Sequence, residues 1–134
     1  MLKLTRIKDV KLPERSGRNA GFDFFIPNDI DCDPVLNGFY LNPQQNCNIP
    51  SGIKVRVPKD HCLIAFNKSG IASKYNLIIG ACVVDENYTG EIHLNIVNLK
   101  KKKFEINPGM KLIQFVLIKV NYAVVMEHDY ISEM

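Results

Sequence analysis

The segment from Asn67 to Asn98, NKSGIASKYNLIIGACVVDENYTGEIHLNIVN, holds three kinds of structural signal. It begins with Lys68-Ser69-Gly70, at a point where a strand gives way to a short helical turn. Such a corner offers a cation, a hydroxyl and backbone N–H groups to an anion, because the first N–H groups of a helix have no internal acceptors. The sequence therefore predicts an anion-binding position here.

The middle of the stretch is an apolar run, Leu77 to Val84, that ends on the carboxylate of Asp85. A turn carrying Tyr88 comes next, and an alternating apolar and polar segment, residues 91–98, follows the turn. Strand patterns on both sides of a glycine-containing turn are typical of a β-hairpin. We expect a hairpin with a rigidly held acid before its tip and an aromatic ring on the tip.

Short strands are expected along the rest of the chain, separated by turns rich in Pro, Gly and Asn. The predicted strands lie at residues 2–7, 39–41, 54–57, 61–66, 111–120 and 121–129, with a turn at 49–53. No long amphipathic helix is evident. Many short strands at near-regular spacing predict one all-β domain over residues 1–134, built as a sandwich or barrel.

The composition limits the class of function. The chain has 134 residues, of which 46% are hydrophobic and 23% charged, with a net charge of +3. This charge suits an anionic ligand but is small for a nucleic-acid-binding protein, and the run Lys100–Lys103 is expected to be a solvated tip. Neither a membrane span nor a signal-peptide core is evident. We expect a cytoplasmic protein with no membrane or nucleic-acid partner.

The four cysteines are widely spaced and include no Cys-x-x-Cys pair. Zinc ligands usually come in such close pairs, and disulfides are rare in a reducing compartment. The cysteines are therefore expected to be mostly inert side chains.

Four segments, in this order along the chain, resemble the motifs of the trimeric dUTPases. Ala20-Gly21-Phe22-Asp23 resembles the first motif and Lys68-Ser69-Gly70 the second. Gly80-Ala81-x-Val83-x-Asp85-Glu86-x-Tyr88-x-Gly90 resembles the third, and Pro108-Gly109-Met110-Lys111-Leu112-Ile113-Gln114 the fourth. The resemblance implies a distorted jelly-roll β-barrel of the dUTPase type. It also implies a homotrimer with a swapped C-terminal strand and active sites between subunits.

The same resemblance implies a hydrolase that converts dUTP to dUMP and pyrophosphate, a step of dUMP biosynthesis in nucleotide metabolism. Asp85 would be the general base that activates water for attack on the α-phosphate. Asp23 would hold Mg²⁺ through bound water, because Mg²⁺ keeps most of its hydration shell. Tyr88 would lie under the deoxyribose, and backbone groups of the hairpin would read uracil. The substrate-binding residues would be Lys68, Ser69, Gly70, Cys82, Val83, Tyr88 and Gln114.

Three features depart from the usual pattern of the family. Lys68 stands where Arg is usual. A guanidinium that can form two parallel hydrogen bonds to a phosphate is thereby replaced by a single ammonium charge. Cys82 stands at a hairpin position usually held by glycine in the eukaryotic pattern. The Gly-rich fifth motif, whose Arg contacts the γ-phosphate, is missing. The candidates to replace it are the loop Arg15–Arg18, which leads into Asp23, and Tyr130.

Two other functions fit part of the pattern. One is a catalytically weak or inactive dUTPase-like protein that binds a nucleotide or a protein partner, as the missing arm suggests. The other is a dCTP deaminase, which shares the fold and also lacks the arm. The deaminase pattern has Glu where Asn95 stands and Arg where Ser73 stands, so the sequence disfavours this activity.

Overall fold

The computed structural model describes residues 1–30, 36–37, 40–81 and 83–132. The strands are β1 (Lys3–Arg6), β2 (Phe22–Phe24), β3 (Leu36–Asn37), β4 (Tyr40–Leu41), β5 (Asn46–Arg56), β6 (His61–Asn67), β7 (Leu77–Ile79), β8 (Val83–Val84), β9 (Glu91–Asn98), β10 (Phe104–Glu105) and β11 (Ile113–Lys119). A short helix, α1 (Ser69–Tyr75), joins β6 to β7. The predicted all-β fold is therefore confirmed. Within the described ranges, no helix has the length and apolarity needed to span a membrane.

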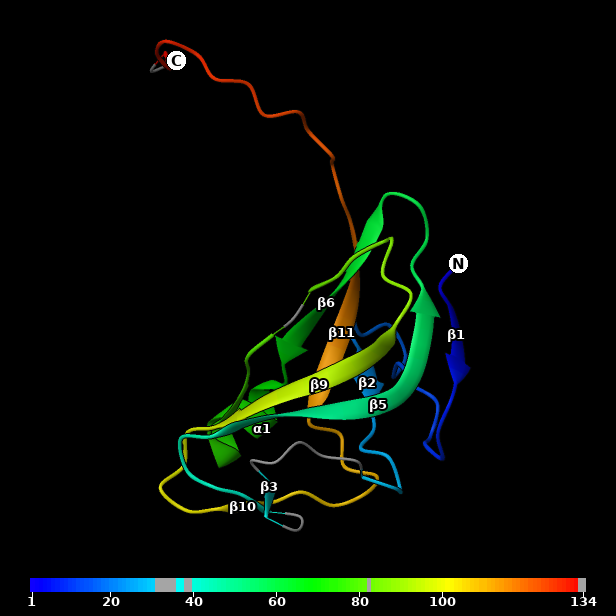
Figure 1. Ribbon diagram of the computed structural model, residues 1–134, viewed down its shortest axis with the longest axis vertical. Coiled ribbons are helices and arrows are strands. Elements are labelled where there is room, and N and C mark those ends of the chain that lie inside the picture. The colour runs from blue at the N-terminus through cyan, green and yellow to red at the C-terminus, as the bar shows by residue number, and fades with distance from the viewer. Residues whose placement is uncertain (31–35, 38–39, 82, 133–134) are drawn as a thin grey trace.

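Two four-stranded sheets form the body of the molecule. The first has the strand order β1-β5-β9-β7 and the second β2-β11-β6-β8, while a small sheet has the order β10-β4-β3. Figure 1 shows β5 and β9 crossing in front of β11, with β6 beside them and with β3 and β10 at one end. This layering is that of a jelly roll. The predicted jelly-roll fold of the dUTPase type is therefore confirmed, and among the described residues the two large sheets stay separate without closing into a barrel. The reason is that the chain leaves one sheet for the other after β7, and the edge strands do not pair across the gap.

The hydrophobic core fills the space between the two large sheets. Ile49 and Leu94 come from the first sheet and Leu63 from the second, and all three are fully buried. The rings of Phe24 and Phe115 lie with their centroids 4.6 Å apart. Burial of a side chain of this size contributes roughly 1.5–3 kcal/mol. The core therefore fixes the sheets relative to each other, together with the polar residues at the strand ends.

The predicted turn at residues 49–53 is an irregularity inside the long strand β5. The register of β5 against β9 shifts between Pro50 and Lys54. Pro50 has no N–H for a ladder hydrogen bond, and Gly52 has a φ of 75°, which glycine adopts without strain. A bulge bends a strand without ending it, and Figure 1 shows β5 curving. The turn prediction is wrong because Pro and Gly mark bulges as well as turns.

The apolar run at residues 77–84 forms two strands, not one. β7 pairs with β9, whereas β8 pairs with β6 in the other large sheet. The chain crosses between the sheets at Gly80, where a Cβ atom would lie 1.9 Å from Oδ1 of Asn95. The turn after β8 does form, because the N–H of Tyr88 donates to the carbonyl of Asp85 at 3.1 Å. The strands beside this turn belong to different sheets, so the predicted β-hairpin is wrong.

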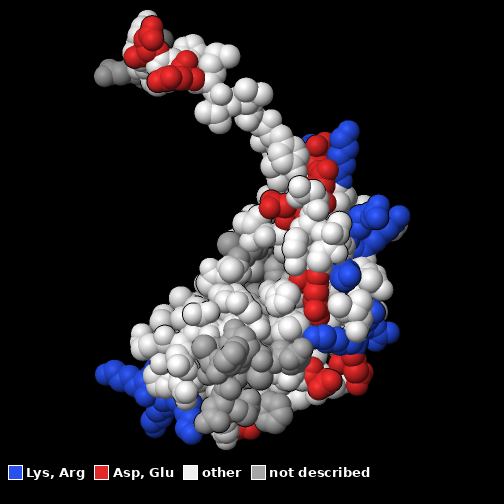
Figure 2. Space-filling model, viewed as in Figure 1, with Lys and Arg blue, Asp and Glu red and all other residues white. Residues whose placement is uncertain are grey.

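The C-terminal segment, residues 121–132, extends away from the body (Figure 1). Its side chains are all exposed, including Val124 at 89% and Val125 at 96%. Figure 2 shows it as a narrow projection with acidic side chains near its end. The segment contains no strand, so the strand predicted at residues 121–129 does not form within this chain. A strand needs a neighbour for its backbone hydrogen bonds, and the described residues of the same chain place none beside it.

Candidate active site

Strand β11 brings three of the predicted site residues together. It lies between β2 and β6, so that Gln114 is opposite Asp23 on one side and Phe66 on the other. Lys68 follows directly after β6, at the same end of the sheet. Its Nζ atom lies 2.5 Å from Oδ1 of Asp23. We call Asp23, Lys68 and Gln114 the Lys68 corner.

The ion pair of the Lys68 corner is largely shielded from water. The side chains of Lys68 and Asp23 keep 25% and 17% of their exposure. Opposite charges attract more strongly in such a place than on an open surface. The Lys68 ammonium has more N–H donors than this ion pair uses, and the Asp23 carboxylate has a second oxygen that can accept a hydrogen bond. The corner can therefore engage an anionic group and a hydrated cation without a change in the backbone.

The Gln114 side chain bonds to the backbone of Asn67 and lies in the space that Gly21 leaves open. Its Nε2 atom donates to the carbonyl of Asn67 at 2.9 Å, so the amide crosslinks β11 to the last residue of β6. A Cβ atom on residue 21 would lie 2.2 Å from Oε1 of Gln114. The glycine of the first motif is therefore needed for Gln114 to lie across β2.

Ser69 and Gly70 begin α1 beside the Lys68 corner. Lys68 has an extended backbone, with φ −91° and ψ 123°, and the helix starts at the next residue. Ser69 and Gly70 are exposed, and no atom lies within 4 Å of the place a Cβ on Gly70 would take. The predicted change from strand to helical turn is confirmed, and the surface there is open to a ligand.

A loop with two arginines lies next to Asp23. The backbones of Glu14 and Asp23 exchange two hydrogen bonds, of 3.1 and 2.7 Å. The Arg15 guanidinium lies 4.8 Å from the centroid of the Phe22 ring, and Arg18 is exposed. The expected closeness of this loop to Asp23 is confirmed. Contact of either arginine with a phosphate stays a prediction.

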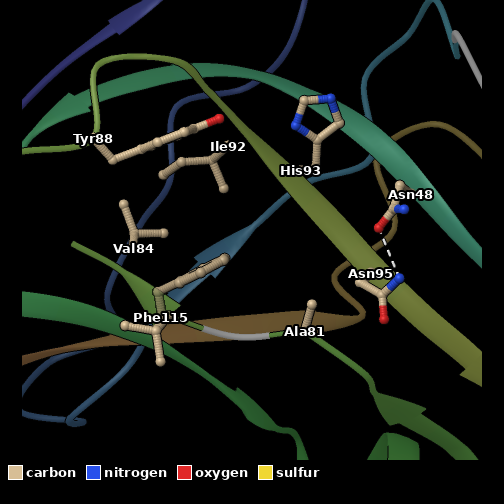
Figure 3. Close-up of a pocket in the computed structure, with 9 residues that line it drawn as sticks. Asn48, Ala81, Val84, Tyr88, Ile92, His93, Asn95 and Phe115 are labelled. Carbon is tan, nitrogen blue, oxygen red and sulfur yellow. Dashed lines mark hydrogen bonds between the residues drawn. The ribbon is translucent and has the colours of Figure 1, made fainter.

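Tyr88 belongs to a separate pocket of about 150 Å³. The pocket is lined by Asn48, Ala81, Val83, Val84, Tyr88, Ile92, His93, Asn95 and Phe115. In Figure 3, Tyr88 lies at one end with Val84, Ile92 and Phe115, whereas Asn48, His93 and Asn95 lie at the other end. The Tyr88 hydroxyl donates to the carbonyl of Glu91 at 2.6 Å, which fixes the ring over the turn. Val83 and Tyr88 thus lie together, whereas Cys82 is outside the described residues.

The asparagines of this pocket were not among the predicted site residues. Asn95 is only 7% exposed, and its amide donates to Oδ1 of Asn48 at 2.7 Å (Figure 3) and to the carbonyl of Cys47 at 3.3 Å. Polar residues that alternate with apolar ones along a strand usually face water. Asn95 is buried because the segment at Gly80 covers it, and no local sequence pattern signals that cover.

Asp85 is exposed at the start of the turn after β8. The next residue, Glu86, is half-buried. Its Oε1 atom accepts hydrogen bonds from the N–H of Asp60 at 2.6 Å and from the phenol of Tyr122 at 3.3 Å. Desolvation, and then the charge of Glu86, raise the pKa of Tyr122. The phenol therefore keeps its proton at neutral pH and is the donor in this bond.

The Lys68 corner and Asp85 lie at opposite ends of β6. Val84 pairs with Leu63 and the two strands are antiparallel, so Asp85 continues towards the start of β6. Lys68 follows the last residue of β6, Asn67. About six residues separate the two positions along the strand, which is roughly 20 Å at the usual rise of ~3.3 Å per residue. One chain therefore does not bring Asp85 to the Lys68 corner.

The oxygen ligands of the Lys68 corner fit Mg²⁺ better than a transition metal. In the described part of the chain, no three His, Cys, Asp or Glu side chains gather as metal ligands, and Cys47 and Cys62 are buried thiols. Asp23 offers a carboxylate beside the amide of Gln114. Such a set suits Mg²⁺ held mainly by water and phosphate oxygens, and does not suit a transition metal enclosed by side chains.

Comparisons with known proteins show the family of this chain. The dUTPase family model matches residues 8–134. The deoxyuridine 5'-triphosphate nucleotidohydrolase of Chlamydia trachomatis is 39% identical over 80 residues, which are 58% of this chain and 55% of that protein. The enzyme of the same name from Neorickettsia sennetsu is 28% identical over 136 residues, which cover 99% of this chain and 87% of that protein.

Among solved structures, the Staphylococcus bacteriophage 80alpha dUTPase superimposes with a TM-score of 0.84 over 99% of each chain. It is 19% identical to this chain, so the likeness is one of fold. The match spans only about half the length of the chlamydial relatives. The family model, however, covers nearly the whole sequence, and the chain therefore belongs to the dUTPase family.

Proposed function

We propose that this chain hydrolyses dUTP to dUMP and pyrophosphate. The Lys68 corner carries the proposal, because segments resembling three of the family's motifs meet there on β2, β6 and β11. A cation, a carboxylate and an amide in contact supply what a metal-bound triphosphate needs, namely charge neutralisation and directed donors. Membership of the dUTPase family supports the choice of nucleotide.

At the Lys68 corner, we assign phosphate binding to Lys68, Ser69, Gly70 and Gln114. Asp23 would orient water molecules around Mg²⁺, which agrees with its single carboxylate. When bound, Mg²⁺ would neutralise charge on the phosphates. Lys68 would turn its ammonium from Asp23 towards a phosphate oxygen, a movement that needs only a change of side-chain rotamer.

Asp85 is the proposed general base, and the pocket beside it the proposed nucleoside site. Asp85 is exposed, so a water molecule can reach its carboxylate within the hydrogen-bond distance that a base requires. The Tyr88 ring would lie against the deoxyribose and leave no room for a 2′-hydroxyl. The backbones of Cys82 and Val83 would bind the edge of uracil and reject cytosine by leaving polar groups unpaired.

The complete active site is proposed to form between copies of the chain. Asp85 and Lys68 of one chain lie roughly 20 Å apart, yet both must act on the same phosphoryl group. A second copy must therefore supply one of them, as the family's homotrimer would. The exposed apolar side chains of Val124 and Val125 give the C-terminal segment a surface to bury on a neighbour.

Two solved structures support the nucleotide and the metal. The phage 80alpha dUTPase was solved with dUPNHPP, and the structure of a mutant dUTPase from phage phi11 shows the coordination of a structural Mg(II) ion. Each is 22% identical to this chain. Their support therefore comes through the shared fold and not through individual residues.

With Mg²⁺ present, the purified protein is expected to release pyrophosphate from dUTP much faster than from dCTP, dTTP or UTP. The reason is that a slot of fixed polar groups rejects a mismatched base or sugar. Pyrophosphate release from the four nucleotides, measured in parallel with and without a chelator, tests this expectation. Tight dUTP binding by calorimetry without pyrophosphate from any nucleotide would indicate a binding protein instead. Release of ammonia from dCTP would indicate a deaminase.

A further inference from the structure

We infer that Glu86 is a positioning residue that holds the turn containing Asp85 and ties it to the start of the C-terminal segment. The inference rests on the proposed role of Asp85 as general base. Glu86 is adjacent to Asp85 in the sequence, but its carboxylate turns to the body of the protein and contacts Asp60 and Tyr122. It therefore acts on the turn and not on the substrate.

The bond from Asp60 to Glu86 stabilises a strained turn. Asp60 has a φ of 63°, in the left-handed region that non-glycine residues rarely occupy. The turn is closed by the N–H of His61, which donates to the carbonyl of Pro58 at 3.2 Å. The N–H of Asp60 lies 2.6 Å from Oε1 of Glu86, and a bond to a charged acceptor is about twice as strong as a neutral one. The turn and Glu86 thus fix each other.

This bond places Asp85 between two anchors. Before it, Val84 is buried and pairs with Leu63 in β6. After it, Glu86 bonds to Asp60, directly before β6 begins. Both anchors belong to the same strand and its preceding turn, so Asp85 moves with β6. A catalytic group displaced by about 1 Å can lose roughly 10²-fold in rate, and anchors on both sides prevent such a displacement.

The same turn also holds the start of the C-terminal segment. The N–H of Val120 donates to the carbonyl of Asp60 at 2.7 Å, and the phenol of Tyr122 donates to Glu86 at 3.3 Å. The segment at residues 121–132 therefore leaves the body beside Asp85. In the proposed oligomer, attachment of this segment to another copy of the chain would set the position of Tyr122 and, through Glu86, that of the base.

Glu86→Ala is expected to lower kcat for dUTP by about 10–100-fold with KM nearly unchanged, because the base shifts while the Lys68 corner is untouched. Glu86→Gln keeps an oxygen acceptor for the N–H of Asp60 and should retain most of the wild-type kcat. Tyr122→Phe loses only the longer bond and should lower kcat less than Glu86→Ala. Asn87→Ala changes the next residue, which is exposed, and is the matched control with wild-type kcat.

Hydrogen exchange at the amide of Asp60 gives a readout that does not depend on activity. Exchange should be faster in Glu86→Ala than in the wild type and unchanged in Asn87→Ala. Wild-type kcat in Glu86→Ala, or equal losses in the Ala and Gln variants, would overturn the inference. If the wild type releases no pyrophosphate, the proposed function fails instead, and the exchange rates still decide whether Glu86 holds the turn. Should Glu86→Ala not fold, Glu86→Asp, which keeps the charge on a shorter side chain, replaces it in each comparison.

Discussion

The variant Asp85→Asn is expected to hydrolyse dUTP about 10²–10⁴ times more slowly than the wild type, the usual contribution of a positioned general base. Asparagine has nearly the same size as aspartate but does not accept a proton from the attacking water. Asp85 is exposed and follows the buried Val84, so the substitution leaves the strand pairing intact. The affinity for dUTP should change much less than kcat. Single-turnover kinetics and calorimetric binding measure the two quantities separately.

The control for this variant is Asn87→Ala in the same turn, which should leave both kcat and affinity unchanged. Near-normal turnover by Asp85→Asn would show that another group is the base. An equal loss of affinity and turnover would show that Asp85 contributes to binding and not to proton transfer.

The variant Lys68→Ala is expected to lower kcat for dUTP by about 10²–10³-fold, a usual loss when one preorganised donor to developing charge is removed. It also leaves the carboxylate of Asp23, which is 17% exposed, without its ammonium partner. Lys68→Arg should retain activity, because a guanidinium provides the charge and can form two parallel hydrogen bonds to a phosphate. Steady-state kinetics of the two variants, measured side by side, gives the comparison.

Lys74→Ala is the matched control for Lys68→Ala. Lys74 lies on α1, the helix that follows Lys68; it is exposed, and its ammonium lies 5.1 Å from the centroid of the Tyr75 ring. Its removal should leave kcat unchanged. If Lys68→Ala keeps wild-type kcat, or if Lys74→Ala loses as much, then the Lys68 corner does not bind the reacting phosphates.

The sequence was sufficient to propose Asp23, Lys68 and Gln114 as site residues, because each stands in a segment that resembles a dUTPase motif. Their mutual contact depends on sheet register, with Gln114 opposite Asp23. A shift of one residue would turn each side chain to the other face of the sheet. A single sequence does not specify that register, so the ion pair could not be predicted.

Strand boundaries and long-range partners were harder to predict. An apolar run such as residues 77–84 looks the same whether it stays in one sheet or crosses between two. The crossing needs Gly80 because of Asn95, and Glu86 bonds to Asp60. Each of these partners is distant in the sequence and leaves no local pattern. The polar residues that support the turn therefore emerged only from the structure.

Mixing two inactive variants tests most directly whether the active site is shared between copies of the chain. When Asp85→Asn and Lys68→Ala chains are unfolded and refolded together in equal amounts, random assembly of a symmetric oligomer gives about a quarter of the sites both wild-type groups. We predict that the mixture recovers about a quarter of the wild-type activity per site, although each variant refolded alone stays nearly inactive. If Asp85 and Lys68 of the same chain formed the site, every site would lack one of them. A mixture as inactive as its components would therefore contradict the account.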